Sequence, residues 1–179
     1  MTAQSLRGVL IDRALDLLDA GDTELSLRGL ARAAGVSAMA PYRHFADRAA
    51  LMQAIAEAGF DRLRDRLAAA DAGADAPVAA LVAQGLAYIA FAHQHPILFR
   101  LMFSDELPAE RAGCGDIAYT VLADRVASLG PSDPEAATIA AWGLVHGLAT
   151  LMLDGRLPPD PAGHTAALRL LAGTIAGQG

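Results

Sequence analysis

Apolar residues recur every three or four positions along most of the chain, which is the period of an amphipathic α-helix. The pattern predicts nine helical segments and no convincing strand. Two short segments lie between residues 26 and 48, and the others cover residues 4–20, 47–70, 77–93, 96–103, 116–129, 134–153 and 163–175. We therefore expect an all-α fold.

Residues 26–48 show the signals of two short helices joined at Gly35. Ser26 can cap the first helix, because its hydroxyl accepts an otherwise unpaired backbone N–H. Gly35 can end that helix, since glycine adopts the left-handed conformation without steric penalty. Ser37 provides a second N-cap two residues later, so the second helix should cross the first steeply. This layout is typical of a helix-turn-helix DNA reader.

Pro41 lies in the first turn of the second short helix. Proline has no backbone N–H, so the first intrahelical bond to the Ser37 carbonyl cannot form there. Phe45, further along the segment, is expected to close the small core. We expect a recognition helix whose first turn is slightly loosened.

Four short motifs resemble the DNA-binding domain of the tetracycline-repressor (TetR) family over residues 5–55. They are Leu25-Ser26-Leu27-Arg28, Ala34-Gly35-Val36-Ser37, Tyr42-Arg43-His44-Phe45 and Asp47-Arg48. A weaker resemblance, at Trp142, His146 and Gly147, is to the WHG type of C-terminal domain in that family. The resemblance implies a three-helix DNA-binding domain over residues 1–48, including the start of the connecting helix. Residues 49–179 would then form a helical effector-binding and dimerisation domain.

The resemblance assigns DNA-contacting roles to matching positions. Ala38, Met39 and Tyr42 should face base edges in the major groove, and Arg28 should reach in from the preceding helix. Ser37, Arg43, His44 and Arg48 should lie near phosphates. Arginine suits bidentate contact with guanine O6 and N7, so Arg28 is the candidate for one strong base contact. Ala38 and Met39 cannot hydrogen-bond, which leaves thymine methyl groups and DNA shape for the remaining specificity.

The charge of the chain is unevenly distributed. The 179 residues carry a formal net charge of −6, yet residues 26–48 hold four arginines against Asp47 alone. DNA binding should therefore be confined to one patch and weaken with added salt. The single cysteine, Cys114, excludes an intrachain disulfide, and the acidic residues of the first helix do not suit a secretory signal. We expect a cytoplasmic protein.

Residues 136–153 carry no charge, so this helix should be buried all round or cross a membrane. Its flanking acids and the DNA reader favour burial against a second subunit. Gly143 and Gly147 would allow close approach of helices, and residues 163–175 would complete a four-helix interface. A homodimer built through the last two helices would match an inverted-repeat operator.

The larger domain contains polar and aromatic residues in apolar surroundings. We expect a pocket for a small apolar or amphipathic effector whose binding releases a repressor from its operator. The candidate lining residues are Tyr88, Phe91, Phe99, Met102, Phe103, Tyr119, Trp142 and His146, with Gln84 and His93 nearby in sequence. The alternative is that His146 is a hydrogen-bonded core residue and Trp142 a packing anchor.

Other function classes have less support. His93, His95 and His146 could bind a metal in a metal-responsive regulator, although no acid or cysteine pattern accompanies them. The chain could also be a helical partner-binding protein whose reader no longer binds DNA. It shows no nucleophile motif, phosphate-binding glycine loop or close carboxylate pair, so we expect neither an enzyme nor a cofactor.

Overall fold

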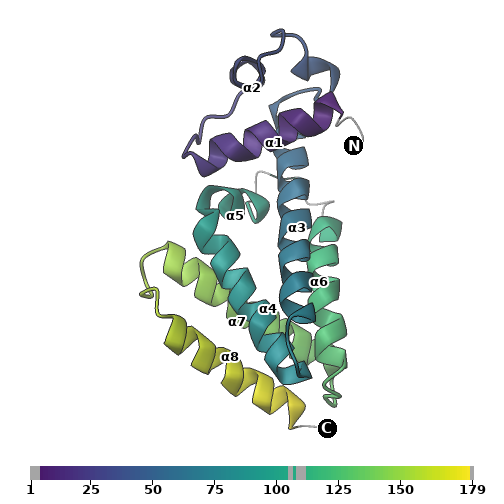
Figure 1. The fold of residues 1–179 in the computed structure, drawn as a ribbon, viewed down its shortest axis with the longest axis vertical. Coiled ribbons are helices and arrows are strands. Elements are labelled where there is room, and N and C mark those ends of the chain that lie inside the picture. The colour runs from purple at the N-terminus through teal and green to yellow at the C-terminus, as the bar shows by residue number, and fades with distance from the viewer. Residues whose placement is uncertain (1–4, 105–106, 108–111, 178–179) are drawn as a thin grey trace. The chain divides into compact units, whose positions relative to one another are not determined.

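The computed structural model describes residues 5–104, 107 and 112–177, and confirms the all-α fold (Figure 1). Over these residues it contains eight α-helices, one 3₁₀ helix and no strand. The residues form two compact units. The first comprises residues 1–59 and 95–111, and the second comprises residues 60–94 and 112–179.

In the first unit, side-chain caps form at Ser26 and Asp47, but the N-cap predicted at Ser37 does not form, because the 3₁₀ helix that follows begins after Ala40 with no side-chain cap. The elements of this unit are α1 (Leu6–Asp19), α2 (Leu27–Ala33), the 3₁₀ helix η1 (Pro41–Arg43), the first part of α3 (Arg48–Ala72) and α5 (Pro96–Met102). Ser26 Oγ accepts the Gly29 N–H at 3.1 Å, and Asp47 Oδ1 accepts the Ala50 N–H at 2.8 Å. The expected start of the first helix at Gln4 lies outside the described residues.

The expected recognition helix is shorter and tighter than predicted. It is a turn followed by η1, whose bonds run from Arg43 N to Ala40 O and from His44 N to Pro41 O. Pro41 cannot donate to the Ser37 carbonyl, which instead accepts the Ala40 N–H at 2.9 Å. The bonds from Ser37 to His44 are thus i→i+3, and an i→i+4 bond returns where the Phe45 N–H donates to the Pro41 carbonyl at 2.9 Å. A slightly loosened α-helix was therefore the wrong prediction.

Helix α5 packs within the first unit, which the sequence did not indicate. A Cβ atom added at Gly59 of α3 would lie 2.7 Å from Met102 Sδ and 3.0 Å from Leu98 Cδ1. At its start, His95 Nδ1 lies 2.7 Å from Asp19 Oδ1 of α1. The expected domain boundary at residues 48/49 stays a prediction.

The second unit contains longer helices around α4. Its elements are the end of α3, α4 (Pro77–Gln94), α6 (Ala112–Ala127), α7 (Pro134–Leu153) and α8 (Pro161–Ala176). Helix α4 packs against α6, α7 and α8. Its approach to α8 is close, because a Cβ atom at Gly85 would lie 2.6 Å from Leu168 Cδ2.

Helix α6 begins at Ala112, four residues before its predicted start. Gly113 and Gly115 were expected to bound the helix but lie inside it, because glycine only lowers helix propensity and does not end a helix by itself. Nothing is described of the side chain of Cys114.

Helix α7 is long and apolar enough to cross a membrane by length and composition alone. An 18-residue window within it has a mean hydropathy of 1.6, and 28% of that window is buried within the chain. One such helix is weak evidence of a membrane span. The low burial shows instead that much apolar surface on α7 has no cover from its own chain.

Candidate nucleic-acid interface and effector site

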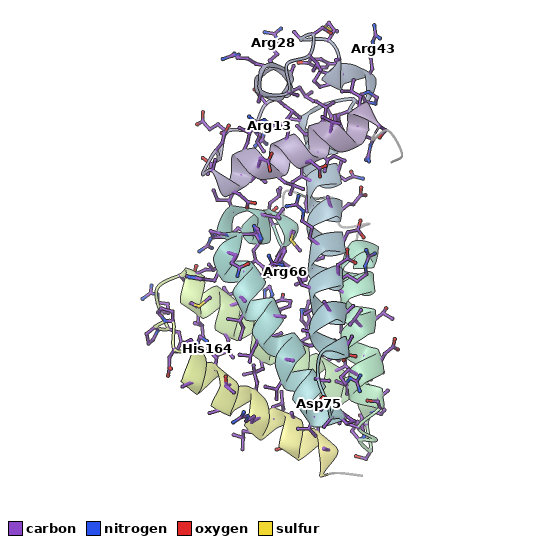
Figure 2. The ribbon with its side chains drawn as sticks, viewed as in Figure 1. Arg13, Arg28, Arg43, Arg66, Asp75 and His164 are labelled. Atoms are coloured by element: carbon purple, nitrogen blue, oxygen red, sulfur yellow. The ribbon has the colours of Figure 1, made fainter. Side chains whose placement is uncertain are left out.

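Three exposed arginines, Arg28, Arg32 and Arg43, lie on α2 and η1. Figure 2 shows Arg28 and Arg43 at one end of the first unit. Within the described residues, neither these two nor Arg32 has a hydrogen-bond or ion-pair partner. Their guanidinium groups can therefore bind phosphates or base edges without breaking an internal bond. They are three of the four arginines from which the sequence predicts a cationic patch, and the fourth is Arg48.

The apolar residues expected at base edges are also exposed. Met39 is 64% exposed and Tyr42 is 41% exposed, although both belong to residue types that are usually buried. Pro41 and Phe45 of the same segment face inward instead. The short turn thus separates a core face from a face that can enter a groove.

The residues expected near phosphates differ in their surroundings. Ser37 and His44 are exposed, as is Arg43. Arg48 is engaged, since its Nε donates to the Leu25 carbonyl oxygen at 3.1 Å. No local sequence pattern indicates that bond, because its partners are 23 residues apart. A phosphate contact by Arg48 stays a prediction.

Four of the eight expected effector residues form one aromatic cluster in the second unit. The ring centroids of Tyr119 and Trp142 lie 5.8 Å apart, those of Trp142 and His146 lie 6.2 Å apart, and those of Tyr88 and His146 lie 6.3 Å apart. The Tyr88 hydroxyl lies 2.9 Å from His146 Nδ1. Helices α4, α6 and α7 each contribute to this cluster.

Burial shifts the pKa values of the two polar groups in the cluster, the Tyr88 hydroxyl and the His146 ring. Burial raises the pKa of the Tyr88 hydroxyl, and a hydrogen bond with Trp142 lowers it in part. The Tyr88 hydroxyl and His146 Nδ1 share a hydrogen bond, and the tautomer of the His146 ring decides which of the two donates. Burial also lowers the pKa of His146, which favours the neutral ring that can accept this bond. His146 makes the hydrogen bond that the alternative expects, although it is half-buried rather than in the core, and Trp142 is 41% exposed. Whether these residues bind an effector or only pack stays a prediction.

The other expected effector residues lie elsewhere. Phe91 is fully buried in the second unit, with the Arg66 guanidinium 5.6 Å from its ring centroid. Phe99, Met102 and Phe103 belong to the first unit, where the two phenylalanine rings lie 4.9 Å apart. The structure brings Tyr88, Tyr119, Trp142 and His146 together within the second unit, whereas three of the other four residues belong to the first unit.

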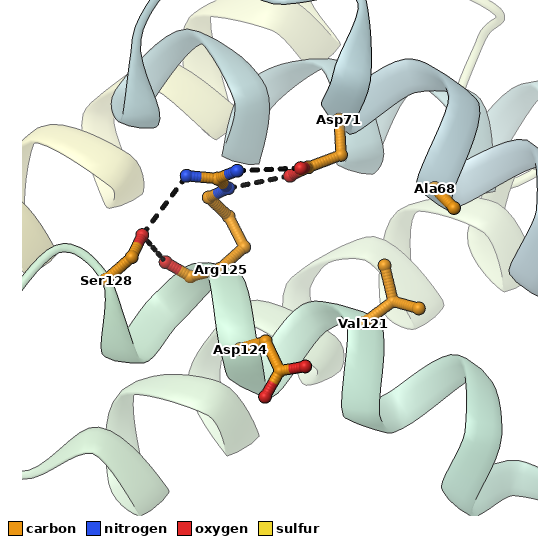
Figure 3. A pocket seen from close by; sticks show the side chains of 6 residues that line it. All are labelled: Ala68, Asp71, Val121, Asp124, Arg125 and Ser128. Atoms are coloured by element: carbon orange, nitrogen blue, oxygen red, sulfur yellow. Dashed lines mark hydrogen bonds and ion pairs between the residues drawn. The ribbon is translucent and has the colours of Figure 1, made fainter.

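A pocket of about 250 Å³ opens in the second unit, and none of the expected effector residues lines it (Figure 3). It is lined by Ala68, Asp71, Val121, Asp124, Arg125 and Ser128. Arg125 donates two hydrogen bonds to the Asp71 carboxylate, each of 2.6 Å, and the side-chain amide of Gln84 donates to the same carboxylate at 2.7 Å. The Arg125 guanidinium beside it holds the pKa of Asp71 below its ordinary value. Sequence patterns could not find this pocket, because its two walls are about 50 residues apart.

The described histidines do not converge on a metal site. His95 is paired with Asp19 in the first unit, and His146 with Tyr88 in the second. Among the described residues, no group of three or more histidine, cysteine, aspartate or glutamate side chains could hold a metal ion. The metal-responsive alternative gains no support from this arrangement.

Two family models match the chain. That of bacterial regulatory proteins of the tetR family covers residues 10–55, which include α2 and η1. That of the tetracyclin repressor-like C-terminal domain covers residues 81–174, more than half of the chain. The chain belongs to the TetR family. It is therefore a DNA-binding transcriptional regulator, and the family is one of regulators and not of enzymes.

Solved structures agree with this assignment. A protein of unknown function from Rhodococcus sp. RHA1 is 32% identical, with a TM-score of 0.79, and the match covers 98% of this chain and 96% of that one. A TetR family transcription regulator from Marinobacter aquaeolei VT8 is 18% identical, with a TM-score of 0.67 and 94% of each chain covered. The TetR family repressor AlkX from Dietzia sp. strain DQ12-45-1b, implicated in biodegradation of n-alkanes, is 20% identical, with a TM-score of 0.65 and 97% of each chain covered. No curated protein sequence matches the chain.

Proposed function

We propose that this TetR-family regulator is a homodimeric repressor that leaves an inverted-repeat operator when a small apolar or amphipathic molecule binds. The observation that carries the proposal is the exposed patch of Arg28, Arg32 and Arg43 beside exposed Met39 and Tyr42. Unpaired cations next to exposed apolar side chains suit a groove lined by phosphates and thymine methyl groups.

Dimerisation through α7 and α8 is supported by apolar surface that the chain leaves uncovered. Leu170 of α8 is 76% exposed and Ile139 of α7 is 55% exposed. No atom lies within 4 Å of a Cβ added at Gly143 or Gly147, so a partner helix could approach closely there. Two readers related by a two-fold axis would then contact half-sites about 34–36 Å apart.

The aromatic cluster supports the proposed class of effector. Tyr88, Tyr119, Trp142 and His146 offer mainly ring surface with few polar atoms, which suits an apolar or amphipathic ligand. The AlkX relative, a repressor implicated in n-alkane biodegradation, agrees with this class. Release of DNA requires that the ligand bind one arrangement of the two readers more tightly than the other.

Selection of bound duplexes from a random-sequence library tests the DNA reader. The wild-type chain should enrich inverted repeats, and Arg28→Ala should lose about 1–3 kcal/mol of discrimination at one base position of each half-site. Arg32→Ala, on the same helix, is the matched control and should leave base preference unchanged. A library that shows no enrichment over its starting pool would contradict the proposal.

Sedimentation of the purified chain tests the dimer. Leu170→Glu places a charge in the apolar face of α8 and should convert a dimer to a monomer. Ala79→Glu, at an exposed position of α4, should leave the dimer intact. A wild-type chain that sediments as a monomer at all concentrations would exclude the two-fold arrangement.

A further inference from the structure

The arginines of the reader fall into two groups by what their side chains bind. Arg28, Arg32 and Arg43 have no partner within the described residues. Arg13 of α1 and Arg48 of α3 each donate from Nε to a backbone carbonyl oxygen. The exposure of the side chains does not separate the two groups, because all five residues are exposed and belong to the same unit.

The first engaged arginine holds the C-terminal end of α2. The helix ends with Gly35 at φ +66°, the Val36 N–H on the Ala31 carbonyl and the Gly35 N–H on the Arg32 carbonyl. This is the Schellman arrangement, which satisfies two of the last carbonyls and leaves that of Ala33 for another donor. Arg13 Nε fills that place at 3.1 Å. Its positive charge also suits the negative end of the helix dipole.

The second engaged arginine holds the chain where it enters α2. Arg48 Nε donates at 3.1 Å to the carbonyl of Leu25, the residue before the Ser26 cap. Arg48 is the first residue of α3, so the bond joins the start of one helix to the start of another. With only seven residues, α2 is too short to be stable by itself. Bonds at both of its ends therefore decide where its exposed side chains point.

We propose that Arg13 and Arg48 are positioning residues of the DNA reader, which clamp the two ends of α2 and orient Arg28 toward the duplex without contacting DNA themselves. The proposal rests on the DNA-binding function proposed above. It replaces the phosphate contact expected of Arg48 with a bond inside the protein. Arg13 is further held by Asp16, whose carboxylate oxygen lies 3.5 Å from Arg13 Nη1.

Two substitutions separate a clamp from a phosphate contact. In Arg→Gln the side-chain amide nitrogen stands the same number of bonds from Cα as Nε, so the carbonyl keeps a donor while the charge is lost. In Arg→Lys the charge remains, but a methylene group replaces Nε. A clamp should therefore be rescued by Gln and not by Lys, whereas a phosphate contact should be rescued by Lys and not by Gln.

The experiment measures binding of the full-length chain to a duplex that the wild type selects from a random-sequence library, by fluorescence anisotropy at several salt concentrations. Arg13→Lys and Arg48→Lys should each weaken binding about tenfold, as loss of a hydrogen bond from a charged donor does. Arg13→Gln and Arg48→Gln should stay within about threefold of wild type. Neither pair should change the slope of log affinity against log salt.

Two controls complete the test. Arg43→Gln removes a free charge, so it should lower the salt slope by about 0.9 and Arg43→Lys should restore it. The clamp variants should bind a random-sequence duplex as tightly as the wild type does. Partial unfolding would instead weaken binding to the selected duplex and to the random-sequence duplex alike. Rescue of Arg48 by Lys and not by Gln would overturn the clamp alone. A wild-type chain that binds no duplex would overturn the proposed function, and the clamp with it.

Discussion

The reader segment of the first unit and the helical core of the second unit maintain their structures in different ways. Helix α2 and η1 together contain ten residues, and caps, carbonyl bonds from distant arginines and a few buried side chains hold them. Helices α4, α6, α7 and α8 have 16 to 20 residues each and pack through extended apolar faces. A surface that binds DNA must leave polar groups unburied, so directional bonds have to replace packing there.

The largest effect should come from the core of the second unit. Phe91 is fully buried, so Phe91→Ala should lower the free energy of unfolding by about 3–5 kcal/mol. Urea denaturation followed by circular dichroism measures this, with Phe91→Leu as a control that leaves a smaller cavity and should cost less. If both variants lost the same stability, cavity size would not be the cause and the contrast between the units would weaken.

A smaller loss of stability should follow when the ion pair between Asp71 and Arg125, beside the pocket, is broken. Asp71→Asn places an amide N–H₂ group opposite a donor of Arg125 or Gln84, which should cost about 1–3 kcal/mol at neutral pH. The folded-state pKa of Asp71 is lowered, so its contribution is present above its ordinary value of 3.8 and is lost as the pH falls through the lower folded value.

Urea denaturation at a series of pH values checks that prediction. The gap in stability between wild type and Asp71→Asn should be constant near neutrality and close below pH 3.8. Asp124→Asn, in the wall of the same pocket, should change stability by less than about 0.5 kcal/mol. A gap that widens as the pH falls would show that the carboxylate is not the stabilising form.

The smallest effect on stability should come from removing a helix N-cap. It should also distinguish the two units, because only the cap in the first unit should affect DNA binding. Ser26→Ala and Asp133→Ala each remove a helix N-cap, and each should cost about 1 kcal/mol of stability. Only Ser26→Ala should also weaken operator binding, because α2 carries Arg28. Anisotropy at a protein concentration that keeps the dimer intact measures this. Equal loss of DNA affinity in both variants would mean that the reader is not held locally.

Local signals were enough to predict most helices and the exposed patch. Ser26, Asp47 and Gly35 act within a few residues of their own position, so their roles follow from neighbouring sequence. The same holds for prolines that begin helices, at Pro77, Pro96 and Pro134. Helix α8, in contrast, begins at Pro161, two residues before its predicted start at residue 163. Residue spacing also indicated that Trp142 and His146 share one side of α7.

Errors arose where a local signal competed with another constraint. Pro41 was expected to loosen an α-helix, yet it begins a 3₁₀ helix instead. The glycines at 113 and 115 were taken as helix boundaries, and α6 continues through them. In both cases the residue type was informative, but propensity alone could not rank the competing backbone arrangements.

The sequence by itself determined the helical period, the capping and the unequal distribution of charge, because these depend on residues close together in the chain. Only the tertiary structure decided that α5 packs with α1 and α3, that Phe99 and Tyr88 fall in different units, and that Arg13 and Arg48 bind carbonyls beside α2. The bonds of those two arginines join groups 20 and 23 residues apart. A side chain's partner over such a separation is selected by the packing of whole helices, which no local pattern records.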